Sequence, residues 1–445
     1  MNKLMAVSPV DGRYGSKTNE LAEFYSEYGL MKYRVHVETE YFIALSHLGL
    51  PQFSGFPKGR EEELRSIYKN FSETDAELIK QKENITNHDV KAVEYFVKEK
   101  VTELGFGQWS EFIHFGLTSQ DINNTAMPMA LRDSLKEVIV PALGKIQNIL
   151  NGVSEEWRDI PMLARTHGQP ASPTRLGKEM AVFSERLAMQ TMTLVEIPFT
   201  GKFGGATGNL NAHYIAYPAT DWISFANNFL ENSLFIERQQ TTTQIEHYDD
   251  MAALFDCLSR INTILIDMCR DIWSYVSLDY FRQVIVKGEI GSSAMPHKVN
   301  PIDFENAEGN LGMANAMFGF FSSKLPVSRL QRDLTDSTVT RNIGVAMAHS
   351  LIAYKSVMKG FSKLKVNKEK IHNDLEDNWV VVSEAIQTIL RREGYPKPYE
   401  ALLNLTRTGE KINAALMESF IETLNVSNDV KAELKAITPF NYTGK

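Results

Sequence analysis

The chain has 445 residues, of which 43% are hydrophobic, 23% charged and 10% aromatic. This is an ordinary globular composition, and the length exceeds what one hydrophobic core normally serves, so we expect two or three domains. The 47 Lys and Arg residues are outnumbered by 55 Asp and Glu, which gives a formal net charge of -8. Proteins that neutralise nucleic-acid phosphates usually carry the opposite sign, so we expect no nucleic-acid partner.

The cysteine content and the apolar runs indicate the compartment. Cys257 and Cys269 are the two cysteines, and neither lies in a CxxC motif, which argues against a disulfide scaffold and a zinc or iron–sulfur site. The start, MNKLMAVSPVDGRYG, lacks the apolar core of a signal peptide. No apolar run reaches the length of a transmembrane helix. We therefore expect a cytoplasmic protein that does not bind membranes.

Apolar residues at helical spacing predict four long helices, over residues 131–153, 176–197, 251–276 and 343–361. Pro141 lies inside the first and predicts a kink there. The third helix carries an apolar stripe at heptad spacing, and further apolar residues beside the stripe make it broader. Such a broad stripe is typical of a helix that packs against several others. The residues that broaden this stripe are Phe255, Ile264 and Trp273.

Alternating β-type segments are scarce in the sequence, and no strand–helix alternation indicates a doubly wound sheet. We therefore expect an all-α fold built on a central bundle of long helices. The expected domains are 1–111, an N-terminal helical domain; 112–362, the central bundle; and 363–445, a C-terminal helical domain. Segments rich in Gly, Pro, Ser, Thr and Asn break the helices and predict loops where chemistry tends to lie. These segments are 164–175, 201–213, 287–302 and 326–342.

Two candidate polar sites come early in the chain. His88 stands beside Asp89 in TNHD, and a hydrogen bond between them would fix the imidazole tautomer; a helix N-cap by Asn87 or Asp89 is the equally good alternative. Thr118 and Asp121 have capping-box spacing behind Gly116. The N-terminus of such a helix offers unpaired amides to a carboxylate or phosphate, although a plain cap is the simpler interpretation.

Three further segments follow in the middle of the chain. His167 lies in RTHGQP, where an imidazole titrating near neutral pH can donate or accept a proton. The stretch GKFGGATGN, residues 201–209, looks superficially like a phosphate loop but lacks the order of a Walker motif. Residues 246–250, EHYDD, could be drawn as a metal cluster, but we expect a solvated acidic helix start.

The segment GSSAMPHKVNP, residues 291–301, combines hydroxyls, a Lys and an Asn on a loop that begins with Gly. Glycine lets backbone amides close around an anion, and Lys298 supplies a positive charge. A Ser-rich turn with its Lys in solvent is the alternative.

Taken together, these segments resemble a known family. GSSAMPHKVNP is similar to the signature loop of the fumarase and aspartase superfamily, whose members eliminate fumarate from a succinyl compound. Within it, the chain resembles the bacterial-type adenylosuccinate lyases nearly end to end, although it stops at residue 445, where relatives usually carry a further helical tail. The segments that carry the closer resemblance are SPVDGRYG, TNHDVKAVEYF, EFIHF, TSQDINN, RTHGQP, TTQIE and LQRDLTDST.

The resemblance implies a three-domain helical subunit, a homotetramer formed by the central helices, and active sites shared among three subunits. It implies β-elimination of fumarate from adenylosuccinate and from the succinyl aminoimidazole carboxamide ribotide of purine synthesis (SAICAR). Its catalytic residues would be Ser292, the base, and His167, the proton donor; the choice of Ser292 over Ser293 stays open. The implied substrate-binding residues are Arg13, Tyr14, Asn87, His88, Asp89, Thr118, Ser119, Gln244, Ser293, Met295, Lys298, Asn300, Arg332, Ser337 and Arg341.

Proton transfer and carboxylate stabilisation suffice for this reaction, so we expect no metal and no organic cofactor. Another fumarate-releasing lyase, such as argininosuccinate lyase or fumarase, is the nearest alternative. A non-catalytic helical oligomer is the alternative of a different class, and the joint presence of Ser292, His167 and Lys298 argues against it.

Overall fold

A computed structural model describes residues 3–284, 295, 299–406 and 411–444. The chain forms two compact units. The first comprises residues 1–144, 189–263 and 309–355, and the second comprises 145–188, 264–308 and 356–445. The three-domain division with limits at 112 and 362 stays a prediction.

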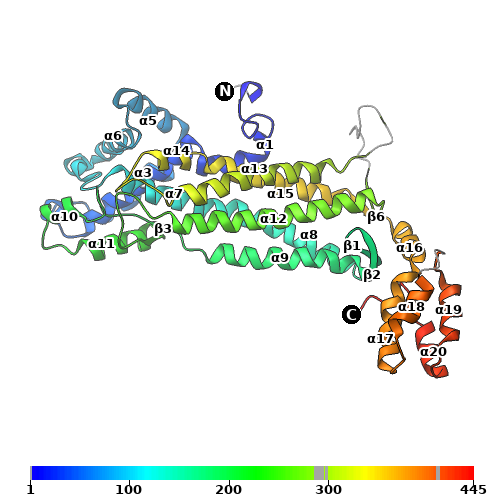
Figure 1. Ribbon diagram of the computed structural model, residues 1–445. Coiled ribbons are helices and arrows are strands. Elements are labelled where there is room, and N and C mark those ends of the chain that lie inside the picture. The colour runs from blue at the N-terminus through cyan, green and yellow to red at the C-terminus, as the bar shows by residue number, and fades with distance from the viewer. Residues whose placement is uncertain (1–2, 285–294, 296–298, 407–410, 445) are drawn as a thin grey trace. The chain divides into compact units, whose positions relative to one another are not determined.

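The described chain is mostly helical, as expected, and Figure 1 labels most of its α-helices. The elements up to residue 112 are η1 Lys3–Met5, α1 Gly15–Thr18, η2 Asn19–Leu21, α2 Ala22–Tyr25, α3 Glu27–His47, η3 Pro51–Phe53, α4 Glu61–Lys69, α5 Glu73–Thr86, α6 Asp89–Val101, η4 Thr102–Phe106 and η5 Gly107–Phe112.

Long helices dominate the middle of the chain. Its elements are α7 Ser119–Ser134, η6 Leu135–Ile139, α8 Val140–Glu156, β1 Pro161–Thr166, β2 Gln169–Arg175, α9 Leu176–Glu196, β3 Thr200–Gly201, α10 Asn211–Ala216, α11 Trp222–Asn228, η7 Phe229–Leu234, β4 Glu237–Arg238, α12 Asp249–Ser277, β5 Phe281–Gln283, α13 Ile302–Lys324, α14 Thr335–Thr340 and α15 Ile343–Ser362.

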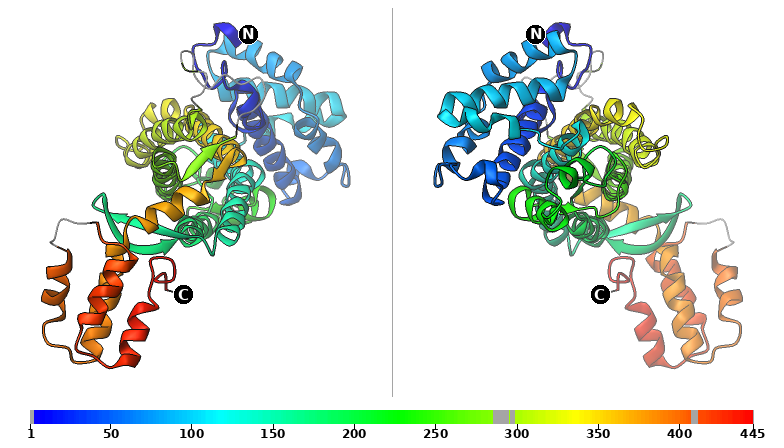
Figure 2. Two further views of the ribbon diagram at one scale, coloured as in Figure 1. Left: turned by 90° about the vertical axis from the view of Figure 1, so that its right-hand side faces the viewer. Right: turned by 90° about the vertical axis from the view of Figure 1, so that its left-hand side faces the viewer.

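The last part of the chain, drawn in orange and red in Figure 2, consists of short helices around their own core. Ile386, Leu390, Met417 and Leu434 are among the buried residues of this core. The elements are β6 Leu364–Val366, α16 Lys368–Glu376, η8 Trp379–Val382, α17 Ser383–Arg392, α18 Pro398–Thr406, α19 Ala414–Thr423 and α20 Asn428–Lys435.

The four predicted long helices are confirmed as α8, with the end of α7, and α9, α12 and α15. On α12 the residues of the stripe are buried, and so are Phe255 and Ile264 beside them. Trp273 differs from the expectation, because 46% of its surface is exposed. Its indole N–H donates to Glu305 Oε1 at 3.0 Å, so a polar contact rather than a neighbouring apolar side chain holds this ring.

A π-helical turn, Leu135–Ile139, stands just before Pro141 and α8, while the kink itself stays a prediction. Proline has no N–H to donate, and its ring collides with the carbonyl four residues earlier. The wider π turn removes that conflict and lets the chain continue as a helix.

The expected loop over residues 164–175 is wrong, because β1 and β2 pair there as an antiparallel hairpin from Pro161↔Arg175 to Thr166↔Gln169. His167 and Gly168 form its two-residue turn with φ values of 53° and 75°. A type I′ turn needs two positive φ values and matches the twist of paired strands. The expected loop 326–342 likewise contains a helix, α14.

The described part of the chain has six short strands, in three two-stranded sheets, and none forms a larger layer. Helices α3 and α13 are the long helices that periodicity missed. On α13 a buried apolar stripe that includes Leu311 and Phe318 is present, but exposed apolar residues such as Met313 and Phe320 on the other face obscure it.

Candidate functional site

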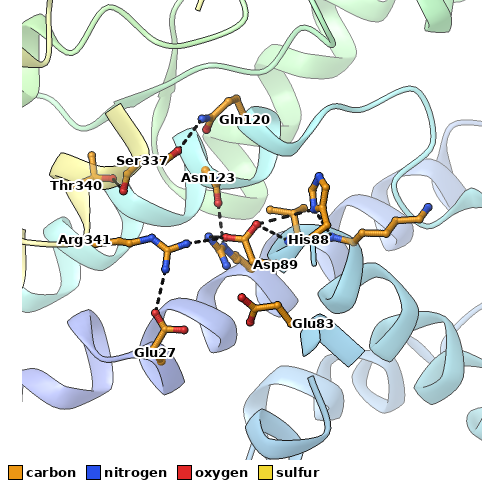
Figure 3. A network of polar contacts seen from close by, with 12 residues as sticks. Glu27, Glu83, His88, Asp89, Gln120, Asn123, Ser337, Thr340 and Arg341 are labelled. Carbon is orange, nitrogen blue, oxygen red and sulfur yellow. Dashed lines mark hydrogen bonds and ion pairs between the residues drawn. The ribbon is translucent and has the colours of Figure 1, made fainter. Parts of the chain in front are cut away.

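The first unit gathers many of the expected substrate-binding residues, and Figure 3 shows one polar network among them. Asp89, the first residue of α6, accepts hydrogen bonds from Arg34 Nη2 at 2.8 Å and from Arg341 Nη2 at 3.0 Å. Arg341 also donates to Glu27 Oε1 at 3.2 Å. Asp89 therefore holds two arginines from distant parts of the chain in one place.

The charge balance of this network keeps Asp89 ionised. Although burial opposes it, the nearby charge of Arg34, the N–H of Val90 and the charge of Arg341 together lower the pKa of the Asp89 carboxyl. Arg34 is almost completely buried and also donates through Nε to Asn123 Oδ1 at 2.9 Å. The network thus fixes Arg341, whose guanidinium is suited to bidentate contacts with phosphate oxygens.

A second cluster in the same unit surrounds Arg332. Its guanidinium donates to Ser337 Oγ at 3.0 Å and to Gln244 Oε1 at 3.3 Å. Asp336 lies beside it, with 3.6 Å between Arg332 Nε and Asp336 Oδ1. Three of the expected residues, Arg332, Ser337 and Gln244, are therefore brought together.

Gln120 links this cluster to the start of α7. Its Nε2 donates to Asp336 Oδ2 at 3.1 Å and lies 3.4 Å from Ser337 Oγ, a contact drawn in Figure 3. Tyr248 also donates to Asp336 Oδ2 at 3.1 Å. Among the described residues, three buried atoms of this cluster lack a hydrogen-bond partner: Gln120 Oε1, Arg332 Nε and Asp336 Oδ1. Buried polar atoms without a hydrogen-bond partner are uncommon in folded proteins, which makes this cluster a candidate site.

Two pockets adjoin these residues. The smaller, of about 30 Å³, has room for one or two waters only and is lined by residues that include Arg34, Gln120, Ser337 and Arg341. The larger, of about 340 Å³, lies between the N-terminal segment and α15, and Arg341 lines it too. Its size falls in the usual range for a small-molecule site.

The expected residues of the N-terminal segment, Arg13 and Tyr14, are neighbours in sequence of residues that line this larger pocket. Arg13 is exposed, and its guanidinium carbon lies 5.9 Å from the centre of the Tyr14 ring. Tyr14 precedes α1, whose first residue, Gly15, lines the pocket.

The expected hydrogen bond between His88 and Asp89 is wrong. Their nearest side-chain atoms, His88 Nδ1 and Asp89 Oδ1, are 3.9 Å apart, which is too far for a hydrogen bond. His88 is itself the N-cap of α6, with Nδ1 accepting from the N–H of Lys91 at 3.2 Å. Neither Asn87 nor Asp89 is that cap; Asn87 ends α5 with a φ of 50°.

The predicted capping box at α7 is confirmed. Thr118 is the N-cap, and its N–H donates to Asp121 Oδ2 at 2.8 Å. Ser119 is the first residue of the helix. The helix entry depends on Gly116, whose φ is 69° and where a Cβ would lie 2.7 Å from the ring of His213.

The predicted solvated helix start at 246–250 is wrong for Glu246 and Tyr248, which are buried. Burial raises the pKa of Glu246 well above its usual value, and the charges of Asp250 and Asp336 raise it further. No metal cluster occurs there or elsewhere in the described ranges, where no three His, Cys, Asp or Glu side chains converge.

In the second unit, His167 is exposed at the turn of the β1–β2 hairpin. Two residues earlier, Arg165 donates to Asp374 Oδ2 at 3.1 Å. Asp374 also accepts from Tyr280 OH at 2.8 Å and from Lys370 Nζ at 2.7 Å. This carboxylate therefore ties the hairpin to α16 close to the predicted proton donor.

The signature loop lies mostly outside the described residues, so the expected roles of Ser292, Ser293 and Lys298 have no structural description. Met295 is half exposed, and Asn300 is partly buried just before α13. Both belong to the second unit.

Sequence reasoning missed Arg34, Gln120 and Asp336, which belong to the clusters described above, and Lys202, which lies 2.9 Å from Asp121. Gln120 and Asp336 lie inside the quoted segments TSQDINN and LQRDLTDST, so a closer look at those segments could have found them. Arg34 lies within the helix α3, and Lys202 lies in a segment that was dismissed as an imperfect phosphate loop.

Comparisons with known proteins now bear on this fold and site. A 3-carboxy-cis,cis-muconate lactonizing enzyme from Pseudomonas putida has a similar structure, with a TM-score of 0.75 at 18% identity over 96% of this chain and 94% of its own. A fumarate lyase from Mesorhizobium has a TM-score of 0.76 at 17% identity over 96% and 95%. These likenesses establish the fold. A family model described as "Lyase" matches residues 12–317, so the chain is a lyase.

The C-terminal match and the curated relatives are more specific. A family model described as "Adenylosuccinate lyase C-terminal" matches residues 328–443. An adenylosuccinate lyase from Dictyostelium discoideum is 58% identical, over 100% of this chain and 97% of its own. One from Escherichia coli strain K12 is 51% identical, over 100% and 98%. The chain belongs to the adenylosuccinate lyase family, whose members are carbon–nitrogen lyases.

No helix in the described part of the chain is both long and apolar enough to cross a bilayer.

Proposed function

We propose that the protein eliminates fumarate from adenylosuccinate, leaving AMP, and from SAICAR, leaving the corresponding carboxamide ribotide. Both reactions belong to purine nucleotide biosynthesis. The observation that carries the proposal is the sequence identity of 58%, along the whole chain, to the adenylosuccinate lyase of Dictyostelium discoideum. The expected segments of the first unit support it, because they bring arginines and hydroxyls together for an anionic substrate.

In the proposed reaction a proton leaves the carbon next to a carboxylate while the bond from the neighbouring carbon to nitrogen breaks. The electron pair of the C–H bond forms the double bond of fumarate, and the nitrogen keeps the pair of the broken C–N bond. Ser292 accepts the proton from carbon, and His167 donates one to the nitrogen. A serine hydroxyl is a weak base, so loop amides and Lys298 would have to favour its alkoxide.

The leaving nitrogen needs a proton donor that reaches into the site from an ordered support. His167 fits this need, because it occupies the turn of a hairpin that Arg165 and Asp374 hold. Its exposure in the second unit leaves the imidazole accessible to a ligand. An imidazole also carries a transferable proton near neutral pH.

The two ends of the substrate would bind different residues. We assign the succinyl carboxylates to the start of α7 and to the signature loop, that is to Thr118, Ser119, Lys298 and Asn300, with Ser293 and Met295 lining the same pocket. We assign the nucleotide to the arginine clusters and the N-terminal segment, that is to Arg13, Tyr14, Asn87, His88, Asp89, Arg332, Ser337 and Arg341. Gln244, which contacts Arg332, would orient the substrate between them. No metal or organic cofactor enters this reaction.

We also propose a homotetramer whose active sites are shared among subunits. Apolar side chains are exposed along α9, where Met189, Met192 and Val195 are each more than half exposed. On α13, Met313 and Phe320 are exposed to a similar degree. Apolar patches on long helices are typical of subunit interfaces. Both cysteines are free and buried, which suits a reducing compartment, and we place the protein in the cytoplasm.

A substrate panel tests the function. The purified protein would be incubated separately with adenylosuccinate, SAICAR, argininosuccinate and malate, and each reaction followed by fumarate release. We expect fumarate from the first two substrates. Activity on argininosuccinate or malate without activity on adenylosuccinate would show another lyase of the superfamily, and no activity on any substrate would indicate a structural oligomer.

Two variants test the proposed residue roles. His167→Ala and Ser292→Ala should each lower turnover by about two orders of magnitude or more while the oligomer stays intact. Near-normal turnover in either variant would show that the residue does not transfer the proton assigned to it.

A further inference from the structure

The glycine-rich segment 201–209 joins two of the expected substrate-binding segments within the first unit. The segment begins at β3 and contains Lys202, whose Nζ lies 2.9 Å from Asp121 Oδ1. Both side chains are fully buried, with no exposed surface. A buried ion pair costs desolvation energy and contributes little stability over an apolar pair, so its presence next to a proposed site calls for another reason.

The carboxylate of Asp121 connects the segment to the start of α7. Its Oδ1 accepts the N–H groups of Gly204 at 2.8 Å and Gly205 at 3.0 Å. Its Oδ2 accepts the N–H of Thr118 at 2.8 Å. Lys202 also donates to the carbonyl of Gly205. One carboxylate thus holds the first turn of α7 and the glycine-rich segment in a fixed relation.

The glycines make this close approach possible. Gly205 and Gly208 have φ values of 74° and 80°, which only glycine adopts readily. At Gly208 a Cβ would lie 2.3 Å from the carbonyl oxygen of Thr242. Two residues further along from Thr242, Gln244 donates through Nε2 to the carbonyl of Ala206 at 3.1 Å. The segment therefore contacts both the α7 entry and the Gln244 segment.

The charge of Lys202 matters because the proposed ligand is an anion. The amides at the N-terminus of α7 attract a carboxylate, but Asp121 places a negative charge within the first turn of that helix. Lys202 neutralises this charge at 2.9 Å. Without Lys202, a buried carboxylate would repel a ligand carboxylate at Thr118 and Ser119.

We propose that Lys202 is a positioning residue for the succinyl end of the substrate: paired with Asp121, it fixes the first turn of α7 and offsets the negative charge there. The inference rests on the proposed function, in which Thr118 and Ser119 bind a succinyl carboxylate. Lys202 acts through Asp121 and does not itself contact the substrate.

Product inhibition of the full-length enzyme separates the two ends of the site. Lys202→Met should weaken inhibition by fumarate by about 10- to 100-fold, since small displacements of binding groups have effects of this size. Inhibition by AMP should weaken by clearly less than inhibition by fumarate, because Asp121, the partner of Lys202, lies in the first turn of α7, whereas Ser337 and Gln244 hold Arg332. Equal weakening of both products, or no change for fumarate, would overturn the inference.

A matched control removes a cation from another buried carboxylate of the same unit. Arg65 Nε lies 2.7 Å from Glu40 Oε1, and Glu40 is almost completely buried. Arg65→Met should lower the melting temperature but leave inhibition by fumarate and by AMP unchanged. A loss of fumarate inhibition in this control equal to that in Lys202→Met would show a general effect of instability and overturn the inference.

A second variant serves if Lys202→Met does not fold. Gly205→Ala keeps both charges but strains the backbone at the N–H that Asp121 accepts. This variant should weaken inhibition by fumarate selectively.

Ser119→Ala tests the premise that the start of α7 binds a succinyl carboxylate. If Ser119→Ala weakens fumarate inhibition and neither Lys202→Met nor Gly205→Ala does, the inference is wrong while the proposed function stands. If Ser119→Ala has no effect, the role of this helix in the proposed function is wrong as well.

Discussion

His213 gives the sharpest pH-dependent prediction, because its ring is fully buried behind the entry to α7. Tyr41 OH donates to the carbonyl of Phe115 at 2.7 Å and lies 2.9 Å from His213 Nε2, so that nitrogen carries the ring proton and donates to the Tyr41 oxygen. Nδ1 is buried and has no partner among the described residues. A second proton on Nδ1 would therefore have no acceptor, and burial lowers the pKa of His213 to about 4 from its ordinary 6.5.

The magnitude follows from this pKa. The unfolded chain takes up the proton as the pH falls below about 6.5, whereas the folded protein resists it until the pH is about 4. The free energy of unfolding therefore falls as the pH falls through this window. A tenfold change in proton affinity is worth about 1.4 kcal/mol, so His213 costs the fold about 2 kcal/mol at pH 5 and about 3 kcal/mol below pH 4.

The assay compares urea unfolding of the wild type and His213→Gln from pH 7 to pH 4.5. The glutamine does not titrate, so the variant loses packing energy at every pH but lacks the pH-dependent part. The difference in the free energy of unfolding between wild type and variant should therefore shrink by about 2 kcal/mol between pH 7 and pH 5. A difference that stays constant across this range would refute the buried, neutral state of His213.

The remaining predictions concern an ion pair, a hairpin and an apolar surface. Asp89→Asn removes the charge that holds Arg341 at 3.0 Å and should lower the free energy of unfolding by about 2 kcal/mol in urea titrations; an unchanged midpoint would contradict this. Asp374→Asn loosens the hairpin that carries His167 and should lower kcat about tenfold with little change in KM, whereas a change in KM alone would argue against the positioning role. Phe320→Glu puts a charge on the exposed face of α13 and should shift the protein to smaller species in sedimentation velocity; an unchanged sedimentation coefficient would place the subunit interface elsewhere.

The long helices could be predicted where burial follows one stripe. Met251, Leu258 and Ile272 recur at heptad spacing and are buried on α12, so the pattern and the packing agree. Helix α13 escaped prediction because apolar residues such as Met313 and Phe320 stand on its exposed face as well, so the buried stripe through Leu311 and Phe318 does not stand out in the sequence. The hairpin at 161–175 escaped because Pro161, Pro170 and Pro173 are atypical of strands, and the pairing across the turn appears only in the fold.

The candidate site was predictable in its segments but not in its partners. The capping box of Thr118 and Asp121 follows from local spacing, and the structure confirms it. The pairing of Asp121 with Lys202, and of Asp89 with Arg34, joins residues far apart in the sequence. Such pairs depend on the fold, and no local pattern indicates them.

The acidic composition was a poor guide to the ligand. The net charge of -8 is a property of the whole chain, whereas a ligand responds to the charges nearest to it. Under the proposed assignment those are Arg332 and Arg341 of the first unit, each placed by hydrogen bonds to neighbouring side chains. Local charge, set by the fold, is what fits an anionic substrate.

The most direct measurement is the stoichiometry of products from adenylosuccinate. Chromatography of a complete reaction should yield AMP and fumarate in equal amounts, and SAICAR should yield fumarate in the same way. Intact adenylosuccinate after prolonged incubation with the folded protein, or release of a succinyl product other than fumarate, would contradict the account.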